Sequence, residues 1–141
     1  MMRKIVFLCV ENSCRSQIAE AYGKMFAPKN YEVFSAGSSP SGRINPKAAS
    51  LMKECNYDLS SHSSTSINTL PKDGVDTIVS MGCGDVCPHV PARQRIEWNI
   101  PDPKEMSVSE FRKVRDIIKN KVEKLFNELD NRDVNNLFMS T

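Results

Sequence analysis

A short apolar run followed at once by a helical pattern constrains the fold of this chain more than any other feature. After Lys4 the run is uniformly apolar to Leu8, which is typical of a strand buried on both faces of a parallel sheet. From Ser16 to Phe26 apolar residues recur at helical spacing, and Pro28 ends the pattern. A strand that passes through a tight loop into a helix begins a parallel β–α–β unit.

Strand and helix patterns alternate along the rest of the chain. Further strands are predicted at 31–36, 77–81 and 95–98, and further helices at 45–55, 67–70 and 107–129. This alternation predicts an α/β fold, a four-stranded parallel sheet with helices on both faces. We expect a single domain over residues 1–130 and a flexible tail over 131–141.

Composition excludes several classes of function. The net charge is only +2, and no dense patch of Lys and Arg accompanies it, so no nucleic-acid partner is expected. The first apolar run is too short for a signal peptide or a membrane span. We therefore expect a cytoplasmic monomer without a membrane partner, whose five cysteines are reduced and more often catalytic or metal-binding than structural.

The loop between the first strand and the first helix carries residues suited to an oxyanion site. Unpaired amides at a helix start, together with the helix dipole, form a cradle for an anion. Arg15 adds a planar fork of donors for two oxyanion oxygens. These positive surroundings favour the thiolate of Cys9, and Ser16 can donate a hydrogen bond to it. We therefore predict attack of a thiolate on phosphate or arsenate. The expected substrate-binding residues are Val10, Glu11, Asn12, Ser13, Cys14, Arg15 and Ser16.

Simpler interpretations of the loop cysteines stay open. Cys9 can also be a small buried residue at a strand end, which is common for a free cysteine. Cys14 is interpreted as a wall residue of the loop, and Cys55 as a structural residue at the end of a helix.

A second pair of cysteines, Cys83 and Cys87, follows the third predicted strand with three residues between them. The carboxyl ends of parallel strands meet at one edge of the sheet, so this pair is expected near Cys9. A redox relay, a structural role and a metal site are all open for it. His62 and His89 are interpreted as surface polar residues, which makes a zinc site a poor match.

A constrained carboxylate, Asp102, lies between two prolines after the fourth predicted strand. A carboxyl group above a thiolate and an oxyanion can act as a general acid that protonates the departing oxygen. The simpler interpretation is a turn, because Asp-Pro pairs commonly form turns. Its place after a strand that ends near the Cys9 loop favours catalysis.

These motifs resemble two related groups of enzymes. The segment from Cys9 to Ser16 resembles the Cys-x5-Arg-Ser loop of the low-molecular-weight protein tyrosine phosphatase fold. Residues 12–17 are more similar to the thioredoxin-coupled arsenate reductases. Segments 34–37, 45–48 and 98–103 also fit, so the resemblance covers nearly the whole chain. The phosphatases usually carry Tyr after the Asp-Pro pair, where this chain has Lys104.

The resemblance to the reductases implies a mechanism. Cys9 would attack arsenate held by the loop and Arg15, while Asp102 protonates the leaving oxygen. Cys83 would then attack Cys9 and release arsenite, and Cys87 would attack Cys83. Cys83 and Cys87 are closer together in the sequence than the two resolving cysteines of better-known members. Their disulfide would be reduced by thioredoxin, or by glutaredoxin or a low-molecular-weight thiol. No tightly bound cofactor is expected.

The chain departs from the family pattern at two further places. Glu11 stands where the loop often has Gly, and we expect its carboxylate to face solvent, because an inward charge would disfavour an anion. Some members bind potassium through Asn, Glu, Ser and Asp side chains. Asn12, Glu20 and Ser35 match that pattern, but Thr65 replaces the Asp.

Two other functions remain open at this point. A tyrosine phosphatase needs only Cys9, Arg15 and Asp102. A domain without catalytic activity would use the same pocket to bind an oxyanion and respond to redox conditions.

Overall fold

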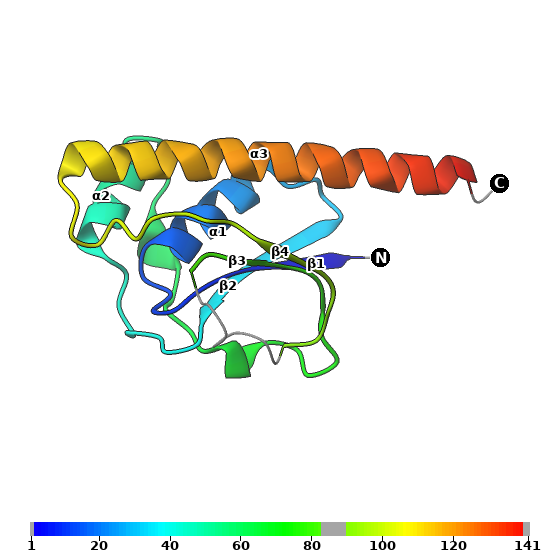
Figure 1. The fold of residues 1–141 in the computed structure, drawn as a ribbon, viewed down its shortest axis with the longest axis horizontal. Coiled ribbons are helices and arrows are strands. Elements are labelled where there is room, and N and C mark those ends of the chain that lie inside the picture. Colours follow the sequence, from blue (N-terminus) through cyan, green and yellow to red (C-terminus); the bar gives the residue numbers. More distant parts are fainter. Residues whose placement is uncertain (1, 83–89, 140–141) are drawn as a thin grey trace.

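The computed structural model describes residues 2–82 and 90–139, with side chains as far as Asn131, and shows an α/β fold (Figure 1). Its elements are β1 (Arg3–Cys9), α1 (Arg15–Phe26), β2 (Tyr31–Gly37), α2 (Pro46–Lys53), η1 (Leu59–Ser61), η2 (Ile67–Thr69), β3 (Val75–Ser80), β4 (Ala92–Glu97) and α3 (Val108–Met139). The strands are hydrogen-bonded in the order β2-β1-β3-β4, and every pair is parallel. The predicted four-stranded parallel sheet is confirmed.

The two faces of the sheet are covered by different elements (Figure 1). On one face Ile5 and Phe7 pack into a large core with residues of α1, α2 and α3. On the other face Val6 and Leu8 join a smaller cluster, against which Ile67 of η2 packs. All four strand residues are fully buried, so β1 is covered on both faces, as its apolar run predicts. The α-helices gather on the first face, and the short 3-10 helix η2 lies on the second.

The last helix is longer than its sequence pattern predicts. The apolar stripe indicated an end near Leu129, whereas α3 continues to Met139 and covers most of the range expected as a tail. Neither Pro nor Gly occurs after Leu129, so the chain holds no strong signal to end the helix. The flexibility of 131–141 stays a prediction. Despite the length of α3, no helix among the described residues is long and apolar enough to cross a membrane.

Candidate active site

A pocket of about 420 Å³ opens at the carboxyl ends of β1 and β3. It is lined by Cys9, Val10, Glu11, Ser13, Cys14, Arg15, Gly82 and Asp102. Cys9 ends β1 and is only 3% exposed, whereas the side chain of Asp102 is 53% exposed. The structure thus places the predicted nucleophile at the base of the pocket, with the predicted arginine and acid around it. Cys83 and Cys87 lie outside the described residues, so their role stays a prediction.

The backbone carbonyls of the loop are turned toward groups that do not line this pocket. Four consecutive carbonyls accept hydrogen bonds from outside the pocket, namely those of Val10, Glu11, Asn12 and Ser13. The donors lie after β2, after η1 and on the side chain of Gln17. In a trans peptide the C=O and the next N–H point in opposite directions. The amides of residues 11–14 therefore face away from these donors. Asn12 permits this path with a φ of 50°, as its residue type predicts.

A chain of hydrogen bonds behind the loop aims the hydroxyl of Ser16 at Cys9. The Oδ1 atom of Asn12 accepts from the amide of Thr65 at 2.8 Å, which fixes the orientation of the Asn12 side chain. Its Nδ2 therefore donates to Ser16 Oγ at 2.7 Å. Because Ser16 Oγ accepts there, its own proton is available to Cys9 Sγ, 2.8 Å away. The Ser16 hydroxyl is thus placed to donate to the sulfur that is the predicted nucleophile.

The guanidinium of Arg15 is held over the pocket from two sides. Its Nη1 donates to the carbonyl of Ile100 at 3.1 Å, and its Nη2 lies 3.8 Å from Asp102 Oδ2. Gly82 makes this position possible, because a Cβ there would lie 2.4 Å from Arg15 Nη1. Gly82 also has a φ of 79°, which disfavours other residues. Sequence reasoning missed Gly82, although a glycine directly after a buried strand is a signal of close approach.

Glu11 faces solvent, as its position in an anion-binding loop predicts. Its side chain is 43% exposed and forms an ion pair with Lys104, whose Nζ lies 3.3 Å from Oε1. The ammonium of Lys104 thereby lies against the negative charge of Glu11 at the outer edge of the pocket.

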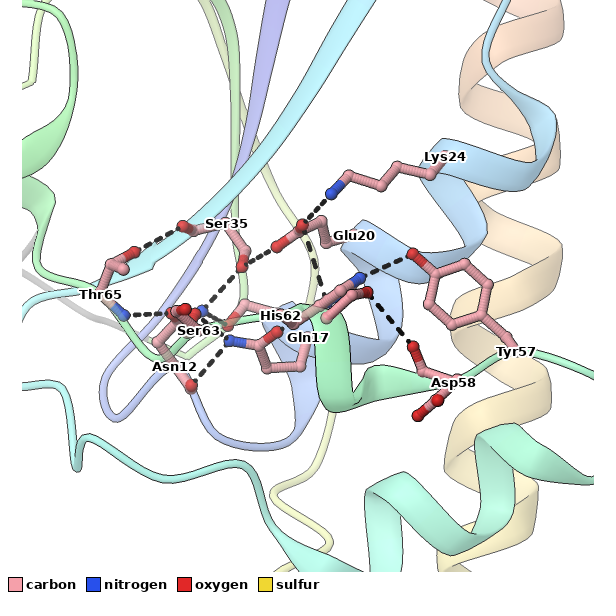
Figure 2. A network of polar contacts seen from close by, with 12 residues as sticks. Asn12, Gln17, Glu20, Lys24, Ser35, Tyr57, Asp58, His62, Ser63 and Thr65 are labelled. Carbon is pink, nitrogen blue, oxygen red and sulfur yellow. Dashed lines mark hydrogen bonds and ion pairs between the residues drawn. The ribbon is translucent and has the colours of Figure 1, made fainter.

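A buried polar network supports the loop from behind, and sequence reasoning missed it (Figure 2). The Nε2 group of Gln17 donates to two backbone carbonyls, including that of Asn12, so Gln17 Oε1 turns to His62 Nδ1 at 2.9 Å. His62 Nδ1 therefore carries the proton, and Nε2 accepts from the hydroxyl of Tyr57 at 2.7 Å. Burial lowers the pKa of His62, which keeps the ring neutral at pH 7. The interpretation of His62 as a surface residue is wrong, because its side chain is fully buried.

The side chains that suggested a potassium site do lie together, but their polar atoms are already paired (Figure 2). Ser35 Oγ donates to Glu20 Oε1 at 2.5 Å and accepts from Asn12 Nδ2 at 3.0 Å. Lys24 Nζ lies 2.7 Å from Glu20 Oε2. Thr65 donates its hydroxyl to the carbonyl of Ser35 at 3.2 Å. The ammonium of Lys24 supplies the positive charge beside Glu20, so these residues do not fit a potassium ion.

The described part of the chain holds three free cysteines, Cys9, Cys14 and Cys55. Cys14 lines the pocket, and its burial raises its pKa to about 11, which keeps it a neutral thiol at pH 7. Cys55 lies outside the pocket lining, 3.5 Å from the hydroxyl of Tyr22. No group of three or more His, Cys, Asp or Glu side chains is placed to hold a metal ion within the described residues. His89 lies outside them.

A cysteine beneath an oxyanion loop, at the carboxyl edge of a parallel sheet, defines a phosphatase-type thiol domain. The family model described as "Low molecular weight phosphotyrosine protein phosphatase" matches residues 4–135. The chain belongs to this family.

Its relatives within the family include arsenate reductases. An arsenate reductase of Bacillus cereus (strain 03BB102) is 38% identical over 130 residues, which cover 90% of this chain and 96% of that protein. A solved arsenate reductase in a phosphate-binding state matches with a TM-score of 0.81 and 35% identity, covering 90% of this chain and 98% of that one. A Corynebacterium glutamicum thioredoxin-dependent arsenate reductase matches with a TM-score of 0.76 and 29% identity. The match covers 93% of this chain and 63% of that one.

Proposed function

We propose that this protein is an enzyme that reduces arsenate to arsenite with thiols as the electron source. One observation carries the proposal. Cys9 lies at the base of the pocket with the Ser16 hydroxyl 2.8 Å from its sulfur, while Arg15 and Asp102 stand around the opening. The similarity to an arsenate reductase over 90% of the chain supports arsenate as the substrate.

In the first step Cys9 Sγ attacks the arsenic atom. A sulfur–arsenic bond forms as one arsenic–oxygen bond breaks. The loop amides and Arg15 hold the remaining oxygens and stabilise the negative charge that develops there. Asp102, acting as the general acid, gives a proton to the leaving oxygen, which departs as water.

In the second step Cys83 attacks Cys9 as a thiolate. A disulfide forms between them, and the electron pair of the sulfur–arsenic bond stays on arsenic, which leaves as arsenite. Cys87 then attacks Cys83 and frees the thiolate of Cys9. Arsenic has gained two electrons, and the two electrons lost by the protein are stored as a disulfide between Cys83 and Cys87.

An external thiol must reduce this disulfide before the next turnover. We assign that role to a thioredoxin, because the chain is similar to a thioredoxin-dependent arsenate reductase. The assignment needs no tightly bound cofactor. We place the reaction in the cytoplasm, where reductants keep such cysteines reduced.

The test is an arsenate reduction assay with the whole protein, supplied separately with a thioredoxin system and with glutathione plus glutaredoxin. We expect many turnovers with thioredoxin. Cys9→Ser abolishes all turnover, and Cys83→Ser stops the reaction before arsenite is released. Cys55→Ser removes a thiol outside the pocket lining and is the matched control, which turns over like the original protein. Steady turnover by Cys83→Ser would contradict the relay.

A second candidate function is hydrolysis of phosphate monoesters, which the family description favours. It needs Cys9, Arg15 and Asp102 but neither Cys83 nor Cys87. Hydrolysis of p-nitrophenyl phosphate that exceeds arsenate reduction, and that survives Cys83→Ser, would establish it instead. A binding domain without catalytic activity would show neither reaction and no selective alkylation of Cys9.

A further inference from the structure

Two oppositely charged side chains meet at the rim of the pocket. Lys104 Nζ lies 3.3 Å and 3.4 Å from the two carboxylate oxygens of Glu11. The backbone amide of Lys104 also donates to Asp102 Oδ1 at 3.1 Å. Glu11 and Asp102 both line the pocket, so Lys104 connects two sides of its rim.

The Glu11–Lys104 pair is much more exposed than Cys9, so it lies on the solvent side of the reacting sulfur. The side chains of Glu11 and Lys104 are 43% and 49% exposed, whereas Cys9 is 3% exposed. A ligand that reaches Cys9 must therefore enter past the rim.

The geometry of displacement decides which part of a ligand lies at that rim. In an in-line attack the leaving oxygen is opposite the attacking sulfur, so it points away from buried Cys9 toward Asp102. In an inorganic oxyanion this oxygen carries at most a proton. In an aryl phosphate it carries the ring, which would have to lie among Asp102, Lys104 and Glu11.

An aromatic ring is a poor neighbour for these three groups. It would either break the Glu11–Lys104 pair or remove water from its charges, and charges that lose water without new partners are costly. The three rim groups provide little apolar surface in return, only the methylene stem of Lys104.

We propose that Glu11 and Lys104 form a charged bar across the pocket rim that selects inorganic oxyanions over aryl phosphate esters. This inference rests on the proposed function, because it takes the pocket above Cys9 as the substrate site. The bar acts on the leaving-group side of the substrate, opposite Cys9.

The test measures occupancy of the pocket without any turnover. Whole protein is treated with iodoacetamide, and alkylation of Cys9 is followed by mass spectrometry of its peptide. Inorganic phosphate and phenylphosphonate, which cannot be hydrolysed, are titrated separately as protecting ligands. The readout is the ratio of their half-protecting concentrations.

We expect phosphate to protect the original protein at a much lower concentration than phenylphosphonate. Lys104→Ala and Glu11→Gln each break the bar, so each should lower the phenylphosphonate-to-phosphate ratio about fivefold. The double variant should show little further change, because both single changes remove the same pair. Lys119→Ala removes one exposed lysine of α3 and is the matched control, with an unchanged ratio.

Two outcomes would contradict the proposed selectivity of the Glu11–Lys104 pair. One is an original protein that binds phenylphosphonate as well as phosphate, and the other is a ratio that no rim variant moves. Failure of the proposed function looks different. The ratios would then shift as expected while the whole protein, supplied with thioredoxin, produces no arsenite from arsenate.

Discussion

Gly82 leaves room for the guanidinium of Arg15. Replacing Gly82 is expected to impair the oxyanion site although Cys9, Arg15 and Asp102 themselves are unchanged. A Cβ at this position would lie 2.4 Å from Arg15 Nη1 and force the guanidinium aside. Gly82→Ala should lower kcat/KM for arsenate about 100-fold, comparable to losing a donor to a developing negative charge. Steady-state kinetics of the purified variant measure the effect.

A second glycine provides the control for that experiment. Gly42 has the same φ of 79° as Gly82, but nothing lies within 4 Å of a Cβ built there. Gly42→Ala therefore carries the backbone strain without the clash. It should lose some stability and keep the kcat/KM of the original protein. Equal kinetic losses in both variants would show that strain, and not the displacement of Arg15, causes the effect.

Lys24 takes the place of a metal cation beside Glu20, so potassium is expected to leave the stability of the protein unchanged. Exchanging potassium for sodium at constant ionic strength should not shift the Tm measured by calorimetry. Lys24→Met should lower the Tm by about 1–3 °C, since the pair is partly exposed and one helical turn apart. Lys119→Met is the control for loss of a surface charge. A rise in Tm specific to potassium in the original protein would contradict this account.

At the scale of elements, one carboxylate joins α2 to α3. Glu54, at the end of α2, accepts hydrogen bonds from Arg112 at 2.9 Å and 3.0 Å and from Arg115 at 2.8 Å. Arg115 also donates to the carbonyl of Leu51 at 2.9 Å. These bonds lower the pKa of Glu54 from 4.5 to about 2.

The depressed pKa predicts how this contact responds to pH. A carboxylate whose pKa falls on folding stabilises the native state above its unfolded pKa, and the contribution is lost as pH falls toward the folded value. Glu54→Gln should therefore lower the urea midpoint at pH 7. The difference from the original protein should shrink as pH falls from about 4.5 toward 2. Glu128→Gln, at an exposed glutamate of α3, is the control for removal of a surface carboxylate.

The elements themselves are largely predictable from local patterns. The apolar run of β1 and the helical spacing after Ser16 specify a buried strand and an amphipathic helix. Asn45 and Pro46 correctly predict the start of α2, where Asn45 Oδ1 accepts from the amide of Lys47 at 2.8 Å. The end of α3 is not predictable in the same way, because the Asp- and Asn-rich stretch after Leu129 has low helix propensity but contains neither Pro nor Gly to end the helix.

Across the whole molecule, the sequence predicts the site residues that lie together in one loop. It predicts less well the contacts between residues that are distant in the sequence. Cys9 and Arg15 lie within one strand–loop–helix unit, so local pattern and chemistry suffice. His62 lies 45 positions from Gln17, and nothing in its serine-rich surroundings indicates burial. The pairing of Glu11 with Lys104, 93 positions apart, likewise depends on the sheet order.

Because the pocket combines the first loop, the end of β3 and the segment before α3, an oxyanion that fills it is expected to stabilise the whole domain. A ligand that binds only the folded state at about 100 times its Kd adds about 2.7 kcal/mol. For a domain of this size that corresponds to a rise in Tm of about 5–10 °C. Calorimetry in sodium phosphate, against sodium chloride of equal ionic strength, measures it.

Phosphate also stabilises proteins by exclusion from their surfaces, so the rise needs a variant that separates the two effects. Arg15→Ala removes the forked donor at the pocket and leaves the rest of the surface nearly unchanged. Site binding predicts that most of the rise disappears in this variant, whereas exclusion predicts an equal rise in both proteins. A rise that depends on Arg15 would show that phosphate holds together three segments that are distant in the sequence.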